Sequence, residues 1–418
     1  MGLLHSDKLK RIKTNWFLII CLTCFFSGCS YSDEPVLIED VNGNKKLTLM
    51  IYMAADNDLE SYALANFKTI EKSITQETNV LVLLDRSEGY DETCGNWTDT
   101  RLYEVLHDDG GSSSINSRRL ECPALDLSSS EATELDMSNS SVLQKFIEFG
   151  KSKYKSEKYA LVIWGHGGGW KAFAIDDRSN SYMSVKELGN AVRNTGLDVI
   201  GFDTCFGGVI ENVYELKDCA EFTVGCPGVS PNSGWDYKSF FEMLSEGDYS
   251  SNSIAFAMSK SSRAAASVFE NRKVSELMAS FENFCKELSL SIQNENDRRQ
   301  ILDSLFASKS YSYTQYPCDM FLDMRALAGL YTSSENTLLS SAAVRLASAA
   351  DDIYGAGLGL HFIPLESSNI MAVRHSEDYV RNENKTDQCA FIKENRWWVP
   401  SLSGDSGSLL DKLFYTIF

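Results

Sequence analysis

The sequence has too few positive charges to balance its negative ones. Its 418 residues include 39 lysines and arginines against 58 aspartates and glutamates, a formal net charge of −19 at pH 7. Such a protein repels phosphate groups, so nucleic acid is not expected as a partner. The same charge suits a basic peptide substrate, although acidity also keeps a protein soluble whatever it binds. With 43% hydrophobic residues, the chain can bury the core of one or two domains.

Signatures of two common kinds of active site are also absent. Apart from Cys21 and Cys24 near the N-terminus, no two cysteines are spaced as C-x-x-C, and the 5 histidines are scattered. This pattern excludes a zinc centre of the usual spacing. The run 166–169 (HGGG) matches the oxyanion loop of lipases, but no G-x-S-x-G elbow occurs, which argues against a serine hydrolase.

The apolar run near the N-terminus, residues 16–26, is too short to cross a bilayer. It follows a basic segment and leads into Ser27-Gly28-Cys29, an order typical of a bacterial lipoprotein signal. We expect residues 1–28 to be a lipoprotein signal peptide, removed before Cys29, whose thiol then carries the lipid. An ordinary signal peptide with an incidental cysteine is the alternative. Residues 29–44 are polar and read as a tether.

The lipid on Cys29 predicts a membrane-anchored protein of the bacterial envelope, at the outer membrane or the cell surface. Acidic residues just after Cys29 resemble the surface-export signals of some Bacteroidetes lipoproteins. A solvated linker explains those residues equally well.

Two short apolar runs, 159–164 and 197–202, each end in small and reactive residues. Their length and flanking glycines predict strands buried on both faces of a parallel sheet. About thirty residues separate them, enough for the crossover helix that parallel neighbours need. Ser184, with Glu187 three positions later, predicts where that helix starts. Parallel neighbours bring the residues that follow them to one carboxyl edge, where α/β sheets build their sites.

The residues brought to that edge are His166 and Cys205. A thiol nucleophile needs a base to remove its proton, and imidazole titrates near working pH. We therefore expect a Cys-His dyad in which Cys205 attacks and His166 transfers protons. Surrounding glycines leave backbone N–H groups accessible, and those of Gly167 and Cys205 are the expected oxyanion donors. A buried structural cysteine and a turn histidine are the alternatives.

Three segments in order resemble the clostripain-like cysteine peptidases, relatives of the caspases and gingipains. They are 47–58 (LTLMIYMAADND), 159–170 (YALVIWGHGGGW) and 201–216 (GFDTCFGGVIENVYEL), with weaker echoes at 231–235 and 357–364. The resemblance covers most of residues 45–365. It implies a caspase-like α/β fold, a three-layer sandwich with a mostly parallel central sheet, and His166 and Cys205 as the dyad.

The resemblance also implies that Asp203 faces the substrate, so that a peptide or protein is cleaved after arginine or lysine. Trp235 is expected on a wall of the same cleft. A turn cap for Asp203 and a core position for Trp235 are the alternatives. The chain departs from the family at 206–208 (FGG), where bulky apolar residues are common. The rival function is a catalytically inactive surface lipoprotein that binds peptide or glycan on a caspase-like scaffold.

The polar stretch 170–183 lies between the two expected catalytic residues. Several members of the resembled family mature by cutting themselves in such a loop after a basic residue. Arg178, which Ser179-Asn180-Ser181 follows, is the better candidate for self-cleavage, and Lys171 is the other. A plain surface loop is the alternative.

The resemblance and the composition divide the mature chain into a caspase-like catalytic core, 45–260, and a helical C-terminal region, 261–418. A late strand near 355–364 is expected to return to the main sheet. Residues 56–58 (DND) are expected to cap a helix over 59–74, with calcium binding as the lesser alternative. No other metal or cofactor is expected. Cys94 and Cys122 flank a polar excursion and are candidates for a disulfide.

Overall fold

The structure of this chain is a computed structural model. It describes residues 44–110, 113–312, 320–362 and 389–395, together with Trp397, Leu409 and Leu413. The expected signal peptide and Cys29 lie outside these residues. Within them, no helix has both the length and the apolar character needed to span a membrane.

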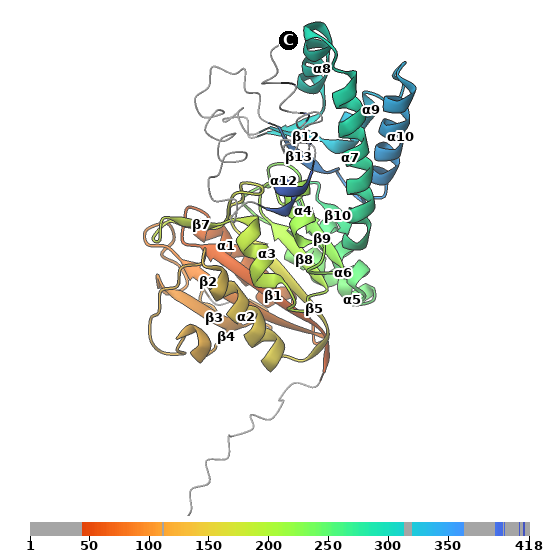
Figure 1. The fold of residues 1–418 in the computed structure, drawn as a ribbon. Helices are drawn as coiled ribbons and strands as arrows, with labels where there is room; N and C mark the ends of the chain where they lie inside the picture. The colour runs from red at the N-terminus through yellow and green to blue at the C-terminus, as the bar shows by residue number, and fades with distance from the viewer. Residues whose placement is uncertain are drawn as a thin grey trace, which may run out of the picture. The chain divides into compact units, whose positions relative to one another are not determined.

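An eight-stranded sheet organises the fold, in the order β10-β9-β8-β5-β1-β2-β3-β4 (Figure 1). The strands are β1 (Lys45–Ala55), β2 (Thr78–Arg86), β3 (Thr100–Glu104), β4 (Arg118–Arg119), β5 (Ser156–Trp164), β8 (Val199–Asp203), β9 (Phe222–Gly225) and β10 (Ser267–Glu270). The five central strands, from β9 to β2, pair in parallel. Antiparallel pairs complete both ends. The mostly parallel sheet predicted from the sequence is confirmed.

Both faces of this sheet are buried, because alternate residues of its central strands enter two different cores. Along β1, Met50 and Tyr52 pack on one side, whereas Leu49 and Ile51 pack on the other. The first side is covered by α2 (Ser140–Lys153), α3 (Val185–Val192) and α4 (Ile210–Leu216). The second is covered by α1 (Glu60–Ser73), α5 (Tyr237–Glu246) and α6 (Ser251–Ser261). Helices on both faces give the expected three-layer sandwich.

Local sequence signals set the ends of these helices. Ser184 and Glu187 form a capping box at the start of α3, as predicted. The expected side-chain cap of α1 is not formed: the helix begins after Leu59 without a side-chain cap, and Asn57 accepts a hydrogen bond from the Leu59 N–H group at 3.0 Å just before it. The carboxylates of Asp56 and Asp58 make other contacts, with the Arg178 N–H group and with His166 respectively.

The C-terminal region is largely helical, as expected. It contains α7 (Val274–Ser291), α8 (Glu295–Ala307), α9 (Met324–Gly329), α10 (Thr337–Asp351) and α12 (Ala390–Glu394). A second sheet joins β11 (Ser310–Ser312), β12 (Met320–Asp323) and β13 (Gly359–Phe362). The late strand therefore pairs with β12 rather than with the main sheet, and Tyr354, which precedes it, makes a single antiparallel bridge to Val268 of β10. Gly359 still touches the core, where its N–H group donates to the Gly208 carbonyl at 3.1 Å.

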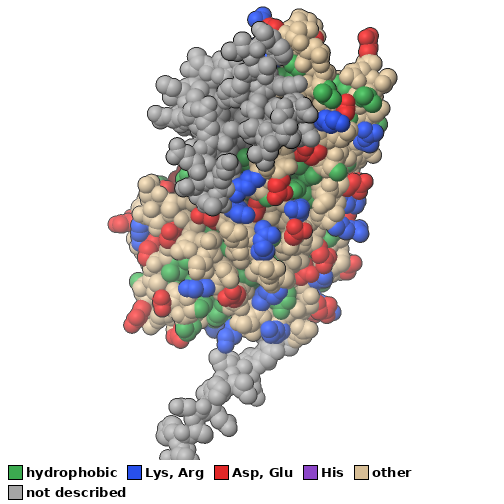
Figure 2. Space-filling model, in the orientation of Figure 1, with side chains coloured by type: hydrophobic (Ala, Val, Ile, Leu, Met, Phe, Trp, Pro, Cys, Tyr) green, Lys and Arg blue, Asp and Glu red, His purple; other side chains and the backbone are tan. Residues whose placement is uncertain are grey.

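Cys94 and Cys122 do not form the disulfide considered from the sequence, because both thiols are free. Cys122 packs in the core on one face of the sheet, whereas Cys94 packs against the core on the other. Acidic and basic side chains are interspersed over the visible face of the described surface (Figure 2).

Candidate active site

His166 and Cys205 leave the sheet at the same edge. Strands β5 and β8 are parallel neighbours in which Trp164 lies opposite Asp203, so the residues that follow them emerge side by side. His166, Asp203 and Cys205 all line one small pocket. The structure thus brings together three residues that the sequence predicted for one site.

The close approach of the two strand ends depends on Gly167. A Cβ atom there would lie 2.3 Å from the Cys205 carbonyl oxygen and 2.8 Å from the Thr204 Cβ atom. These distances are shorter than van der Waals contact, so any larger residue would push the His166 loop away from Cys205. Glycine at this position therefore fixes the separation of the expected base and nucleophile.

The segment 206–208, where the chain departs from the resembled family, packs tightly behind Cys205. Phe206 adopts a left-handed backbone conformation, with φ of 53°, and its ring stacks on Phe321 at 5.0 Å. A Cβ atom at Gly208 would lie 2.5 Å from the Gly225 carbonyl oxygen. Bulky residues would not fit between this turn and β9, which accounts for the glycines.

The Cys205 thiol is held by the backbone of Ser230. The Ser230 N–H group donates to Sγ at 3.3 Å, and Sγ donates to the Ser230 carbonyl oxygen at 3.6 Å. Burial raises the pKa of the Cys205 thiol, and the charge of Asp203 acts in the same direction. The thiol is therefore protonated at neutral pH and requires a base before it can act as a nucleophile.

His166 makes a short contact with a carboxylate that sequence reasoning had taken for a helix cap. Its Nε2 atom lies 2.6 Å from Oδ1 of Asp58. A carboxylate in this position fixes the orientation of the imidazole ring, which leaves the second ring nitrogen for proton transfer. This contact could have been predicted from the sequence, because Asp58 follows β1 and β1 is the neighbour of β5, the strand that His166 follows.

Two backbone donors are available near Cys205. The N–H groups of Gly167 and Cys205 donate to no acceptor within the described part of the chain, although their neighbours are bonded. Gly168 donates to the Ala172 carbonyl and Phe206 to the Gly228 carbonyl, each at 2.8 Å. Among the described residues, both expected oxyanion donors thus lack an acceptor, whereas the next N–H group along the chain is paired in each case.

Asp203 is almost completely buried at the end of β8, with 4% of its surface exposed. Its Oδ2 atom accepts hydrogen bonds from the Trp235 N–H group at 2.9 Å and from the Tyr237 hydroxyl at 3.1 Å. Its Oδ1 atom has no partner among the described residues. Burial raises the pKa of Asp203 to about 7. These bonds differ from the turn cap considered as an alternative, and they leave one acceptor for a ligand.

Trp235 does not line the pocket as expected from the sequence. Its side chain is 2% exposed and packs in the core beneath β8, where a Cβ atom on Gly201 would lie 2.7 Å from the indole ring. Only its N–H group serves the site, through Asp203. The wall of the pocket is formed instead by Ser230, Pro231, Asn232 and Gly234.

The stretch between the two catalytic candidates is more ordered than its composition predicts. Strands β6 (Phe173–Asp176) and β7 (Ser181–Met183) form a hairpin. Phe173 anchors it, with its ring 4.8 Å from that of Phe202. Arg178 lies in the turn, 40% exposed, and pairs with Glu134 at 2.6 Å. Lys171 precedes β6 and is partly buried.

A parallel α/β sandwich with a cysteine and a histidine at one sheet edge defines the caspase-like class. Within that class, residues 51–386 match the clostripain family, Peptidase C11, and the chain belongs to this family. It is 27% identical over 238 residues to clostripain of Hathewaya histolytica. That match covers 50% of this chain and 44% of the clostripain, less than half of the relative's length.

Solved structures are similar in fold. An inactive zymogen C11 protease from Parabacteroides distasonis aligns with a TM-score of 0.57 and 17% identity, covering 80% of this chain and 96% of that one. A secreted C11 cysteine protease from Bacteroides thetaiotaomicron, in complex with an irreversible peptide inhibitor, aligns with a TM-score of 0.53 and 16% identity. That alignment covers 81% of this chain and 97% of the other. The predicted caspase-like architecture is confirmed.

Proposed function

We propose that the protein is a cysteine endopeptidase that cleaves peptides and proteins after arginine or lysine. The observation that carries this proposal is the pocket shared by His166, Asp203 and Cys205, in which a buried carboxylate oxygen has no described partner. Membership of the clostripain family supports the same conclusion.

In the proposed mechanism, Cys205 loses its proton to His166 and its sulfur attacks the carbonyl carbon of the scissile bond. The Gly167 and Cys205 N–H groups stabilise the resulting oxyanion. His166 then protonates the leaving amine, which leaves a thioacyl enzyme. Water, deprotonated by His166, hydrolyses that thioester and restores the thiol. Asp58 keeps the imidazole ring oriented through both halves of the cycle.

Release of the thiol from Ser230 must precede the first step, because Sγ is hydrogen-bonded to that residue in both directions. Substrate entering the pocket passes Ser230 and the neighbouring Pro231, which line it. Binding and activation of the nucleophile are therefore coupled in this proposal.

Asp203 supplies the preference for a basic side chain. A guanidinium or ammonium group that reaches Oδ1 gains a charge-assisted hydrogen bond to a buried carboxylate. A neutral side chain there leaves the buried acceptor unpaired, which is costly. The carboxylate thus favours arginine and lysine for two reasons: it attracts a basic side chain, and it disfavours a neutral side chain that would leave it unpaired.

The experiment that tests this function is covalent labelling by an acyloxymethylketone carrying lysine or arginine. We expect stoichiometric modification of Cys205, detected by intact mass and peptide mapping, and none in the Cys205→Ala variant. The rival function, a non-enzymatic surface lipoprotein that binds peptide or glycan, predicts no labelling of Cys205. That outcome would refute the peptidase proposal.

Self-processing after Arg178 is a second part of the proposal. The residue lies in the turn of the β6–β7 hairpin, its guanidinium is partly exposed, and the proposed specificity favours arginine. Purified active protein is expected to contain two fragments, with the new N-terminus at Ser179. The Arg178→Gln variant should remain intact, whereas the matched Lys171→Gln variant should be cut like the wild type. An active wild-type preparation that consists only of intact chains would contradict this prediction.

Anchoring through a lipid on Cys29 is the remaining part of the proposal, and it places the enzyme in the bacterial envelope. The lipoprotein signal in the sequence supports it. Sedimentation of the full-length chain with envelope membranes tests it, and recovery of all the protein in the soluble fraction would contradict it.

A further inference from the structure

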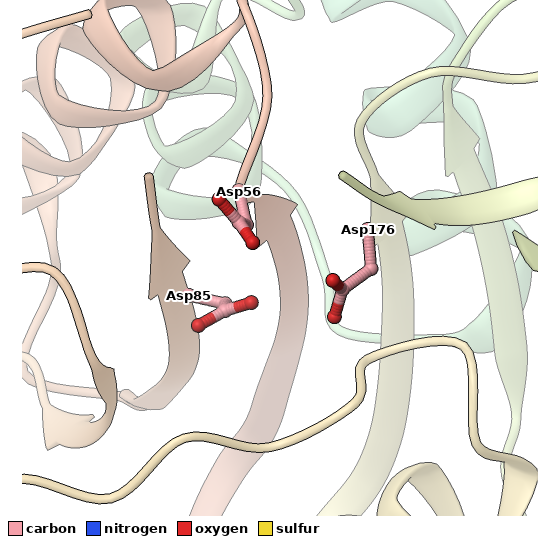
Figure 3. A group of neighbouring side chains, drawn as sticks. All are labelled: Asp56, Asp85 and Asp176. Carbon is pink, nitrogen blue, oxygen red and sulfur yellow. The ribbon is translucent and has the colours of Figure 1, made fainter. Parts of the chain in front are cut away.

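Two different parts of the chain support the carboxyl edge of the main sheet, where the site lies. On one side, the β6–β7 hairpin is tied to the end of β1, because the Asp177 N–H group donates to the Asp56 carbonyl oxygen at 3.0 Å. Figure 3 shows Asp56 and Asp176 on this side, turned toward Asp85 of β2. On the other side, the small sheet β11–β12–β13 of the C-terminal region packs against the loops that carry the proposed base and nucleophile.

Phe321 of β12 is the centre of this second contact. Its side chain is buried and forms a small core with Phe206 and Val209. Three partly buried side chains pack against that core, those of Trp170, Cys205 and Tyr311. The Phe321 ring stacks on the ring of Phe206, with 29° between the two planes. Phe321 therefore supports the turn that directly follows the nucleophile.

The same ring also touches the loop that carries His166. A Cβ atom at Gly169 would lie 2.8 Å from Cζ of Phe321 and 3.8 Å from Cβ of Phe206. The first distance is shorter than van der Waals contact, so glycine at this position lets the loop rest directly on the ring. One aromatic side chain thus contacts both the loop of the expected base and the turn of the expected nucleophile.

A neighbouring strand fixes Phe321 against the site. Tyr311 of β11 lies opposite Phe321, and its ring packs on Gly228, where a Cβ atom would lie 3.3 Å from the ring. The Gly228 carbonyl oxygen accepts the hydrogen bond of the Phe206 N–H group at 2.8 Å. The Tyr311 hydroxyl donates to Oδ2 of the buried Asp323 at 2.6 Å. Tyr311 is therefore bonded to β12 at its hydroxyl while its ring contacts the loop that holds the turn.

The opposite edge of the small sheet is bonded to the same turn. The N–H group of Gly359 in β13 donates to the Gly208 carbonyl oxygen at 3.1 Å, and Gly359 forms a parallel bridge with Val209. A Cβ atom at Gly359 would lie 3.2 Å from Cβ of Phe321. Both outer strands of the small sheet therefore contact the surroundings of the nucleophile, and β12 lies between them.

The turn itself needs such support. The left-handed conformation of Phe206 is unfavourable for any residue with a Cβ atom. It persists only where surrounding contacts hold it. Asn212 holds the backbone, because its side-chain amide donates to the Phe206 and Gly207 carbonyl oxygens at 3.2 Å each. Phe321 holds the side chain.

We propose that Phe321 is a positioning residue for the peptidase reaction, which sets the separation of His166 and Cys205 through its contacts with Gly169 and Phe206. This inference rests on the proposed function, because it assigns the ring a role in that reaction. Displacing two reacting groups by about 1 Å can lower a rate about a hundredfold. The C-terminal region is then part of the catalytic apparatus, although Phe321 itself does not react.

Replacing the ring with a smaller apolar side chain separates positioning from folding. In the full-length chain, Phe321→Leu should lower kcat for an arginine peptide at least about tenfold and change KM less than about twofold. KM should hold because Phe321 is not among the described residues that line the pocket.

Phe146→Leu is the matched control for this variant. Phe146 is also buried, but it lies on α2 and packs against Tyr52 in the core of the main sheet. Its replacement should lower the unfolding midpoint by a similar amount without lowering kcat. An unchanged kcat in Phe321→Leu, or equal losses of kcat in both variants, would overturn the proposal.

A double-mutant cycle tests whether the ring acts through the His166 loop. Gly169→Ala adds a methyl group against Cζ of Phe321 and should lower kcat in the wild-type background. Leucine ends short of that position, so the same change should cost at least about fivefold less in Phe321→Leu. Backbone strain at Gly169, whose φ is 68°, is common to both backgrounds and cancels from the comparison. Independent effects of the two substitutions would overturn the proposed contact between ring and loop.

Alkylation of Cys205 by iodoacetamide provides a readout that needs no substrate. At pH 7 the reaction should be at least about tenfold slower in Phe321→Leu than in the wild type, because the thiol then lacks a well-placed base. The two rates should converge at alkaline pH, where hydroxide removes the proton. Equal rates at every pH would overturn the proposal. A wild-type chain that cleaves no arginine peptide would refute the proposed function alone, since these profiles still decide whether Phe321 positions the base and the nucleophile.

Discussion

Replacing Asp203 with asparagine is expected to lower kcat/KM for arginine substrates by about a hundredfold to ten-thousandfold. The substitution keeps the shape of the side chain but removes the charge that a buried guanidinium needs. Leaving one member of a buried ion pair alone typically costs about 3–5 kcal/mol, which corresponds to a loss of this size. Steady-state kinetics on a pair of peptides that differ only at the basic residue measure the effect.

Two controls separate specificity from folding. Cleavage of a peptide with a neutral residue at that position should change far less, and unchanged turnover of the arginine peptide would refute the role of Asp203. Stability should not fall: burial raises the pKa of Asp203 from 3.8 to about 7, so keeping a carboxylate there costs stability as pH rises through that window. Asparagine avoids the cost, so the variant should gain stability relative to the wild type between those pH values.

Removing the imidazole of His166 is expected to have an effect of similar size. Positioned general acid–base catalysis contributes about a hundredfold to ten-thousandfold to rate, and His166 is the one imidazole among the described residues that line the Cys205 pocket. His166→Ala should therefore lower kcat by about a thousandfold while leaving KM for the arginine peptide close to that of the wild type. Pre-steady-state acylation kinetics would locate the loss in the first chemical step.

Replacing Asp58 tests the role of the imidazole without removing the ring itself. Asp58→Asn should lower kcat by about tenfold, a smaller loss because the Asp58 side chain is 61% exposed and water screens its charge. Asp177→Asn is the matched control, since that carboxylate lies near His166 without a described hydrogen bond to it. Equal activity of the Asp58→Asn variant and the wild type would show that the contact does not position the base.

The sheet edge that carries the site could be predicted because its signals are local. Each apolar run has a length and glycine boundaries typical of a parallel strand, and the capping box at Ser184 marks the crossover between them. Parallel pairing of the two strands then brings His166 and Cys205 to one edge. No long-range information was needed for that step.

Features that depend on packing between distant segments could not be predicted in the same way. The turn around Trp235 contains both an aromatic side chain and a backbone donor, and only the packing beneath Gly201 decides which of them serves the pocket. The late strand fitted the main sheet by composition, but β12 offered it a partner. Asp56, Asp85 and Asp176 are far apart in sequence, and Asp56 was explained as a cap.

The order of strands in the main sheet determines what a break after Arg178 would do. All strands on one side of the β5–β8 boundary precede the hairpin turn in sequence, and all strands on the other side follow it. A nicked molecule would therefore become a two-chain heterodimer whose seam runs through the middle of the sheet, with the imidazole on one polypeptide and the sulfur on the other. Its active site would then lie at the interface between two polypeptides, and neither polypeptide expressed alone would be active.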